Sequence, residues 1–230
     1  MRNTIRMAIQ AWRALGRNNA AIFNNIYKNN LWGKSNESPD NFSSGFGSDT
    51  INSAGYIELV ATYIINNKIK SVVDIGCGDF RVASEILKRI PHDVSYTGLD
   101  VANVIIERNQ RLYQNERIHF AQADATESPL PEGDLVLVRE VLQHLSNKNI
   151  TAVLKRVVGK YEYNIITNTI ANSARAYNID LPSGSNSRAG LGSGLWLDLA
   201  PFNCDISELG SWPHQNRPTN MVSVRINKIN

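Results

Sequence analysis

The chain has 230 residues, of which 42% are apolar and 20% are charged. These values are ordinary for a folded globular protein and exclude a disordered or fibrous class. The formal net charge of +3 is too small to indicate a nucleic-acid partner. Two cysteines, Cys77 and Cys204, cannot build a disulfide framework, so we expect a cytoplasmic protein.

The first predicted element is an amphipathic helix over residues 4–17. Its apolar side carries Ile5, Ile9, Trp12 and Leu15. A different side carries four arginines: Arg2, Arg6, Arg13 and Arg17. Two interpretations remain open. Residues 2–17 make a weak contact with the inner face of a membrane, or the helix packs on the domain and exposes its arginines to water.

A polar, Gly/Ser-rich loop over residues 31–50 follows and keeps three aromatic residues: Trp32, Phe42 and Phe46. A long loop with aromatic residues is more often functional than disordered, so we expect this lid loop to order over a bound cofactor. Ser53 is the predicted N-cap of a helix over 54–67. We therefore divide the chain into an N-terminal helical extension with the lid loop, residues 1–50, and a main domain, residues 51–230.

Strand and helix signals alternate beyond residue 70. The predicted strands are 71–75, 94–99, 117–121, 134–138 and 161–168. The predicted helices are 80–89, 101–113, one that begins at 141–145, and 147–157. This alternation predicts an α/β fold with a doubly wound, mainly parallel sheet. The glycine-rich segment 171–194 is expected to be a mobile loop over the site, with closing strands at 195–199 and 221–226.

The most informative stretch is the acidic-x-Gly-x-Gly turn that follows the first of these strands. Gly76 and Gly78 permit positive φ and a close backbone approach by a ligand. A dinucleotide fingerprint needs a third glycine or an alanine where this chain has Arg81. The turn without that glycine resembles motif I of the class I methyltransferases that depend on S-adenosylmethionine (AdoMet). The resemblance implies a Rossmann-like methyltransferase fold and AdoMet as cofactor.

Acidic residues at the strand ends suit the parts of AdoMet. Asp74 is expected to orient groups around the methionyl ammonium, and Asp100 to accept from the ribose hydroxyls. Asp124 is expected to accept from the adenine amine while the N–H of Ala125 meets the ring. Alternatively, Asp100 caps a helix and Asp124 only makes a turn. The predicted cofactor-binding residues are Asp74, Gly76, Gly78, Asp79, Asp100, Asp124, Ala125 and Arg139.

The predicted catalytic residues are His144, Glu140 and Arg139, which follow the fourth strand. The four-residue spacing predicts that Glu140 and His144 share a helical face, with His144 as base for an acceptor hydroxyl and Glu140 orienting it. The alternative is a structural histidine bonded to Glu140 or to a backbone carbonyl. Arg139 would hold an anionic acceptor or the AdoMet carboxylate, or pair with Glu140. No metal site is expected, because Asp134 lacks companion carboxylates.

Several short motifs resemble a bacterial methyltransferase subgroup linked to surface-glycan synthesis. They are Ile26–Gly33, Ser44–Ser48, Cys77–Phe80 and Arg139–Ser146. The resemblance implies O-methylation of a carbohydrate or similar polar small-molecule or glycan acceptor. The chain lacks the Asn/Asp-Pro-Pro-Tyr motif of methyltransferases that act on the exocyclic amines of nucleic acids. An AdoMet-binding module without turnover, and an N-methyltransferase on a small molecule, remain alternatives.

Overall fold

The structure is a computed structural model that describes residues 2–38 and 40–229. Pro39, within the predicted lid loop, lies outside the described residues, as do the side chains of Arg2 and Arg13 from the predicted arginine face. Among the described helices, none is both long and apolar enough to cross a membrane.

The described chain forms a seven-stranded sheet in the order β3-β2-β1-β4-β5-β7-β6. Strands β1 to β5 pair in parallel, and β7 joins β5 and β6 antiparallel. This arrangement confirms the predicted doubly wound α/β class. The strands are β1 (Ser71–Ile75), β2 (Ser95–Asp100), β3 (Ile118–Gln122), β4 (Leu135–Arg139), β5 (Tyr163–Ala171), β6 (Cys204–Pro213) and β7 (Thr219–Ile229).

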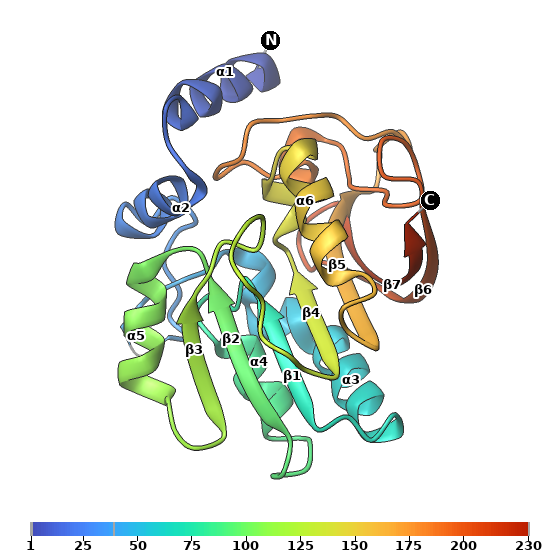
Figure 1. Cartoon of the computed structure of the whole chain (residues 1–230). Coiled ribbons are helices and arrows are strands. Elements are labelled where there is room, and N and C mark those ends of the chain that lie inside the picture. Colours follow the sequence, from blue (N-terminus) through green and yellow to red (C-terminus); the bar gives the residue numbers. More distant parts are fainter. Residues whose placement is uncertain (1, 39, 230) are drawn as a thin grey trace.

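Helices cover both faces of this sheet. In the view of Figure 1, α3 and α4 lie behind the strands, α6 lies in front, and α1 stands at the top, away from the sheet. The α-helices are α1 (Arg2–Ala14), α2 (Asn19–Lys28), α3 (Thr50–Asn66), α4 (Arg81–Leu87), α5 (Asn103–Tyr113) and α6 (Asn147–Val157). Short 3₁₀ helices are η1 (Phe46–Ser48), η2 (Leu142–His144) and η3 (Ala189–Leu191).

The core explains why the central strands read as apolar runs. All four residues of 135–138 in β4 are buried, as are four of the five residues of β1. A parallel strand covered by helices on both faces must be apolar on both sides, so it shows no alternation. The apolar runs stop at Asp74, Asp100 and Arg139, near the carboxyl edge of the sheet, where ligands of such folds bind.

In the first part of the chain the predictions missed one helix and misplaced the start and the N-cap of another. The helix α2 was not predicted, although Asn18 caps it by accepting from the N–H of Ala21 at 2.9 Å. The helix α3 begins at Thr50 rather than at residue 54. Ser53 is therefore not an N-cap; it lies inside α3, and its hydroxyl donates to the carbonyl oxygen of Asp49 at 3.1 Å.

The other errors concern segments after β4. Residues 141–145 do not begin an α-helix, because Glu140 has a φ of 59° and only the short 3₁₀ turn η2 follows. Residues 195–199 form turns instead of a strand, and the edge strand is β6 (Cys204–Pro213). Most of that strand is exposed or half-buried, with two irregularities in its register, so its sequence has no clean period.

Candidate functional site

A cavity lies at the carboxyl edge of β1, β2 and β4. It encloses about 1060 Å³ including its open mouth, which is enough for a cofactor of nucleoside size. Each of the ten predicted site residues lines it. The structure thus brings together residues that lie up to 70 positions apart, although their roles toward a ligand stay predictions. They are Asp74, Gly76, Gly78, Asp79, Asp100, Asp124, Ala125, Arg139, Glu140 and His144.

The glycine turn is packed so closely that its two glycines have no room for side chains. Gly76 and Gly78 have φ values of 74° and 54°, in the left-handed region. A Cβ at Gly76 would lie 2.2 Å from Cγ2 of Val141, and one at Gly78 would lie 2.5 Å from Oγ of Ser44. Asn109 supports the turn from behind by donating to the carbonyl oxygen of Gly78 at 2.7 Å.

Two buried carboxylates face the cavity without an ion pair among the described residues. Asp74 is the penultimate residue of β1, not part of the turn as predicted, and it accepts from the Tyr96 hydroxyl at 2.8 Å. Asp100 accepts from the N–H of Ala102 at 2.9 Å and from that of Gly78 at 3.3 Å. Burial raises the pKa of each carboxyl to about 6. Each carboxylate would gain from a cationic or strongly donating ligand.

The carboxylates of Asp79 and Asp124 are already engaged with the protein. Asp79 accepts from the N–H of Ser44 at 2.8 Å and pairs with Arg81 at 3.1 Å. Asp124 accepts from the N–H and hydroxyl of Thr126 at 2.9 and 2.7 Å, and from the side-chain amide of Asn19 at 2.9 Å. Asp124 therefore has the turn-forming role that was given above as the alternative to adenine binding. Its bond to Asn19 also attaches the start of α2 to the cavity wall.

Arg139 and Glu140 are neighbours at the end of β4 with different surroundings. The guanidinium of Arg139 lies 5.1 Å from the centre of the Tyr56 ring and donates to the carbonyl oxygen of Gly47. Its Nε has no hydrogen-bond partner among the described residues. Glu140 accepts from the hydroxyl of Thr169 at 2.9 Å, and burial raises the pKa of its carboxyl.

The expected pairing of Glu140 with His144 does not form. Glu140 Oε2 accepts instead from the side-chain amide of Gln143 at 2.7 Å. His144 Nδ1 lies 3.1 Å from the carbonyl oxygen of Asn186. A carbonyl only accepts, so Nδ1 carries the proton and Nε2 is left as the unprotonated nitrogen. Burial lowers the pKa of His144 to about 4, so its imidazole is neutral at pH 7 rather than near half-protonation.

A fully buried arginine fixes the turn that carries His144. Arg188 is 0% exposed, and its guanidinium donates to the carbonyl oxygens of Leu142 and Leu145 at 3.1 and 2.9 Å. It also donates to the side-chain oxygen of Asn147 at 2.7 Å and to the carbonyl oxygen of Ile179 at 3.1 Å. These bonds attach the predicted loop 171–194 to η2, so the middle of that segment is anchored.

The lid loop contributes Trp32 to the cavity wall, and its Phe42 packs on Tyr27, another residue of that wall. Phe42 stacks on Tyr27 with ring centres 5.3 Å apart, and Trp32 meets the edge of Tyr27 at 5.2 Å. The Trp32 ring also lies 5.1 Å from the His144 ring, and its Nε1 donates to the carbonyl oxygen of Ser185 at 3.1 Å. These contacts join the lid loop, α2 and the loop 171–194 around one cavity.

Two arginines, Arg81 and Arg108, anchor the lid loop to the domain. Arg81 replaces the missing third glycine, and its guanidinium contacts Ser35 at 2.7 Å, Glu37 at 3.1 Å and Asp79 at 3.1 Å. Arg108 is buried and binds both carboxylate oxygens of Asp40, at 2.6 and 2.8 Å. That arrangement keeps the pKa of Asp40 well below its usual range. Sequence reasoning did not identify Arg108, because nothing in its helical context distinguishes it from a solvated arginine.

Comparison with known proteins supports the predicted fold. Residues 72–159 match the model of a methyltransferase domain family. An uncharacterized methyltransferase of Mycobacterium tuberculosis is 31% identical over 78 residues, which is 33% of this chain and 38% of that protein. An O-methyltransferase of Pyrenophora dematioidea is 29% identical over 48% of each chain. The chain thus covers less than half the length of either relative.

Solved structures match over more of the chain. Human N-acetylserotonin methyltransferase in complex with AdoMet has a TM-score of 0.58 and 14% identity, over 99% of this chain and 67% of that one. The N-methyltransferase NodS from Bradyrhizobium japonicum, with S-adenosyl-L-homocysteine, has a TM-score of 0.54 and 15% identity, over 78% and 89%. The fold is that of a class I methyltransferase. Those two solved proteins hold AdoMet and S-adenosyl-L-homocysteine, respectively.

The chemistry of the cavity fits AdoMet. This cofactor carries an ammonium and a sulfonium against one carboxylate, so it is a net cation. Asp74 and Asp100 are buried carboxylates without a cationic partner among the described residues, and both lie at the wall. Asp100 would hold the ribose hydroxyls and Asp74 the ammonium, which stays a prediction. Sequence reasoning did not assign Asn19, Tyr27, Ser44 and Tyr56 to the site, although all four line the cavity. Tyr27 and Ser44 lie within motifs that were noted only for the subgroup resemblance, and no motif marks Asn19 or Tyr56.

We predict that AdoMet affinity falls as the pH drops below about 6. The pKa of Asp74 and of Asp100 is about 6, and the cationic cofactor favours the ionised forms. Affinity should be constant from about pH 6 up to the pKa of the cofactor's α-amino group, roughly 8. It should fall by about tenfold per pH unit below about pH 6 for each carboxylate that must ionise. Calorimetric titrations across this range test it. Asp100→Asn should bind more weakly at high pH with a shallower fall, whereas a pH-independent wild-type affinity would contradict the assignment.

We also predict that Asp40→Asn loosens the lid loop. The change weakens two charge-assisted hydrogen bonds to Arg108, so amide exchange over residues 40–50 should accelerate by at least about tenfold. Hydrogen exchange with mass spectrometry measures it. Asp93→Asn is the control, because it breaks the exposed pair with Lys70 and should leave this segment unchanged. AdoMet should slow exchange of the same residues, and equal protection with and without cofactor would rule out a lid.

Proposed function

We propose that the protein is an AdoMet-dependent methyltransferase that methylates an oxygen of a carbohydrate or similar polar acceptor in surface-polysaccharide synthesis. The observation that carries the proposal is that one cavity is lined by a glycine turn, a neutral histidine and two buried carboxylates that lack an ion pair among the described residues. The match of residues 72–159 to a methyltransferase domain supports the reaction class. The motifs that resemble the glycan-linked subgroup support the acceptor class.

The chemistry proposed for the protein's own residues is positioning and proton acceptance. Bound AdoMet supplies an electrophilic methyl group on its sulfonium. Trp32 of the lid loop lines the cavity and excludes water from it, which favours transfer to the acceptor. His144 Nε2 takes the proton of the acceptor hydroxyl, and Asn186 instead of Glu140 orients the ring. Arg139, with its free Nε, orients a polar group of the acceptor.

The neutral state of His144 is compatible with an oxygen acceptor. A hydroxyl must lose its proton on methylation, and a base that is unprotonated at pH 7 serves that need. The O-methyltransferase of Pyrenophora dematioidea agrees with this direction, whereas NodS is an N-methyltransferase. The alternatives are therefore N-methylation of a small molecule, and AdoMet binding without turnover. A screen of sugars, nucleotide sugars and amines with methyl-labelled AdoMet separates all three.

We predict that His144→Ala lowers turnover by roughly 10²–10⁴-fold while AdoMet affinity stays near that of the wild type, because the loss lies in proton transfer. At saturating AdoMet, the wild-type rate should fall only as the pH approaches about 4, where the imidazole protonates. His119→Ala on β3 is the matched control, since that histidine is exposed and outside the cavity. Near-normal turnover of His144→Ala would show that His144 is structural and that catalysis depends on positioning alone.

A further inference from the structure

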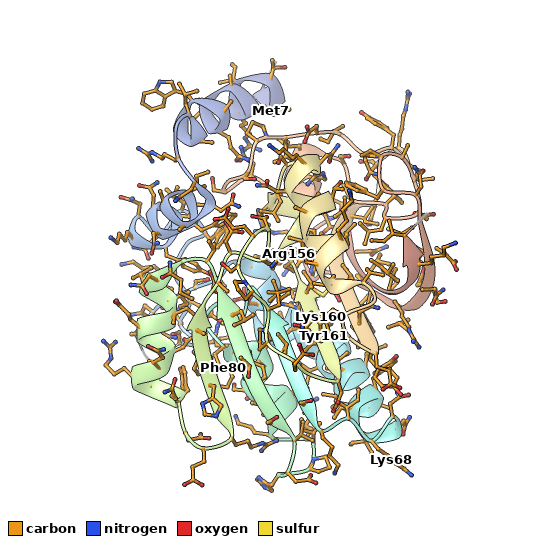
Figure 2. The ribbon with its side chains drawn as sticks, viewed as in Figure 1. Met7, Lys68, Phe80, Arg156, Lys160 and Tyr161 are labelled. Carbon is orange, nitrogen blue, oxygen red and sulfur yellow. The ribbon has the colours of Figure 1, made fainter. Side chains whose placement is uncertain are left out.

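The helix α1 exposes a large apolar surface, and among its described side chains only Gln10 is buried against the protein. Trp12 and Leu15 are 76% and 79% exposed, and Ile5 and Ile9 are 53% and 47% exposed. At 100° per residue, Ile5, Ile9 and Trp12 fall within one 60° sector of the helix. Figures 1 and 2 show α1, labelled at Met7 in Figure 2, at one extreme of the molecule, and the described chain covers this face only in part.

The opposite side of α1 is fixed to the protein by polar contacts. Gln10 is 5% exposed; its amide donates to the carbonyl oxygen of Pro182, and its Oε1 accepts from the N–H of Asn186 at 2.8 Å. The carbonyl oxygen of Arg6 accepts from the Asn186 side chain at 3.3 Å. The helix therefore has a defined orientation, and its exposed apolar sector is presented outward from a folded base.

The charge of the segment is distributed very unevenly. Residues 1–36 hold six of the 24 Lys and Arg residues and none of the 21 Asp and Glu residues. The segment is thus +6, while the remaining 18 basic and 21 acidic residues give −3. Arg6 and Arg17 are exposed beside the apolar sector. A basic region that borders an apolar one is complementary to a surface with anionic groups above a hydrocarbon layer.

We propose that α1 and the turn up to Arg17 dock the protein on an anionic lipid surface, with Trp12, Leu15, Ile5 and Ile9 in the interfacial layer and the arginines at the headgroups. A nucleic acid would match the charge but leave Trp12 and Leu15 exposed. A second copy of this chain would cover the apolar side chains but bring two segments of +6 together. A lipid surface satisfies both features at once.

Docking through α1 would fix the position of the cavity relative to the lipid surface. Asn186 connects the two regions, because its N–H donates to Gln10 of α1 and its carbonyl oxygen accepts from His144 in the cavity wall. The wall of the cavity at His144 is therefore connected to the docked helix through one residue. An acceptor held at the same lipid surface would reach the site without diffusing through bulk water.

The experiment is co-sedimentation of the full chain with vesicles of phosphatidylcholine and phosphatidylglycerol in equal parts, and of phosphatidylcholine alone. We expect binding to the mixed vesicles and much weaker binding to the neutral ones. Trp12→Ser should lower the partition coefficient by at least about tenfold, because it removes the aromatic side chain that would be buried in the interfacial layer of the bilayer. Arg17→Gln should lower it by about fivefold, the loss of one basic residue near an anionic surface.

Matched controls lie at the other end of the molecule. Ile65→Ser and Lys68→Gln remove an exposed apolar and a basic side chain near the end of α3, where Figure 2 labels Lys68 far from Met7, and should leave partitioning unchanged. Unfolding midpoints verify that each variant is folded, independently of any activity. The proposal is overturned by no binding to mixed vesicles, by equal binding to neutral ones, or by Trp12→Ser binding like the wild type. Duplex-DNA binding or self-association in place of vesicle binding would overturn it as well.

Discussion

Close packing of the turn after β1 is the constraint on which the site depends. Without side chains at Gly76 and Gly78, the turn touches Val141 on one side and Ser44 on the other. The two close contacts that exclude a Cβ therefore join three segments: the glycine turn, the residues after β4, and the lid loop. A ligand that lies against this turn is enclosed by all three, which is why residues distant in sequence line one cavity.

Electrostatics divides the acidic residues of the site into two groups. Asp40 and Asp79 are matched by Arg108 and Arg81, and they hold the protein's own segments in place. Asp74 and Asp100 have no such partner among the described residues, and burial raises the pKa of both. Buried carboxylates left without a cation are costly unless a ligand supplies one. The lid loop is therefore stabilised by Asp40 and Asp79, whereas Asp74 and Asp100 are left to bind a cationic cofactor.

The sequence predicted the sheet and the composition of the cavity because both depend on local patterns. Apolar runs that end in an acidic residue or an arginine mark buried parallel strands and their carboxyl ends, so Asp100 and Arg139 were found. The partners of these residues were not predictable. The positive φ of Glu140 breaks the assumed helical spacing to His144, and Asn186 reaches His144 from 42 positions away. The lid loop was identified by composition, but not its attachment through Arg108. The division of the chain at residue 50 stays a prediction.

The central claim is that the cavity binds AdoMet and not a dinucleotide, because Arg81 occupies the position of the third glycine and its guanidinium is committed to Asp79 and the lid loop. The most direct measurement is a pair of calorimetric titrations of the full chain, one with AdoMet and one with NAD, at neutral pH. The account predicts saturable binding of one AdoMet per chain and no heat of binding for NAD. Binding of NAD, or no binding of AdoMet, would contradict it.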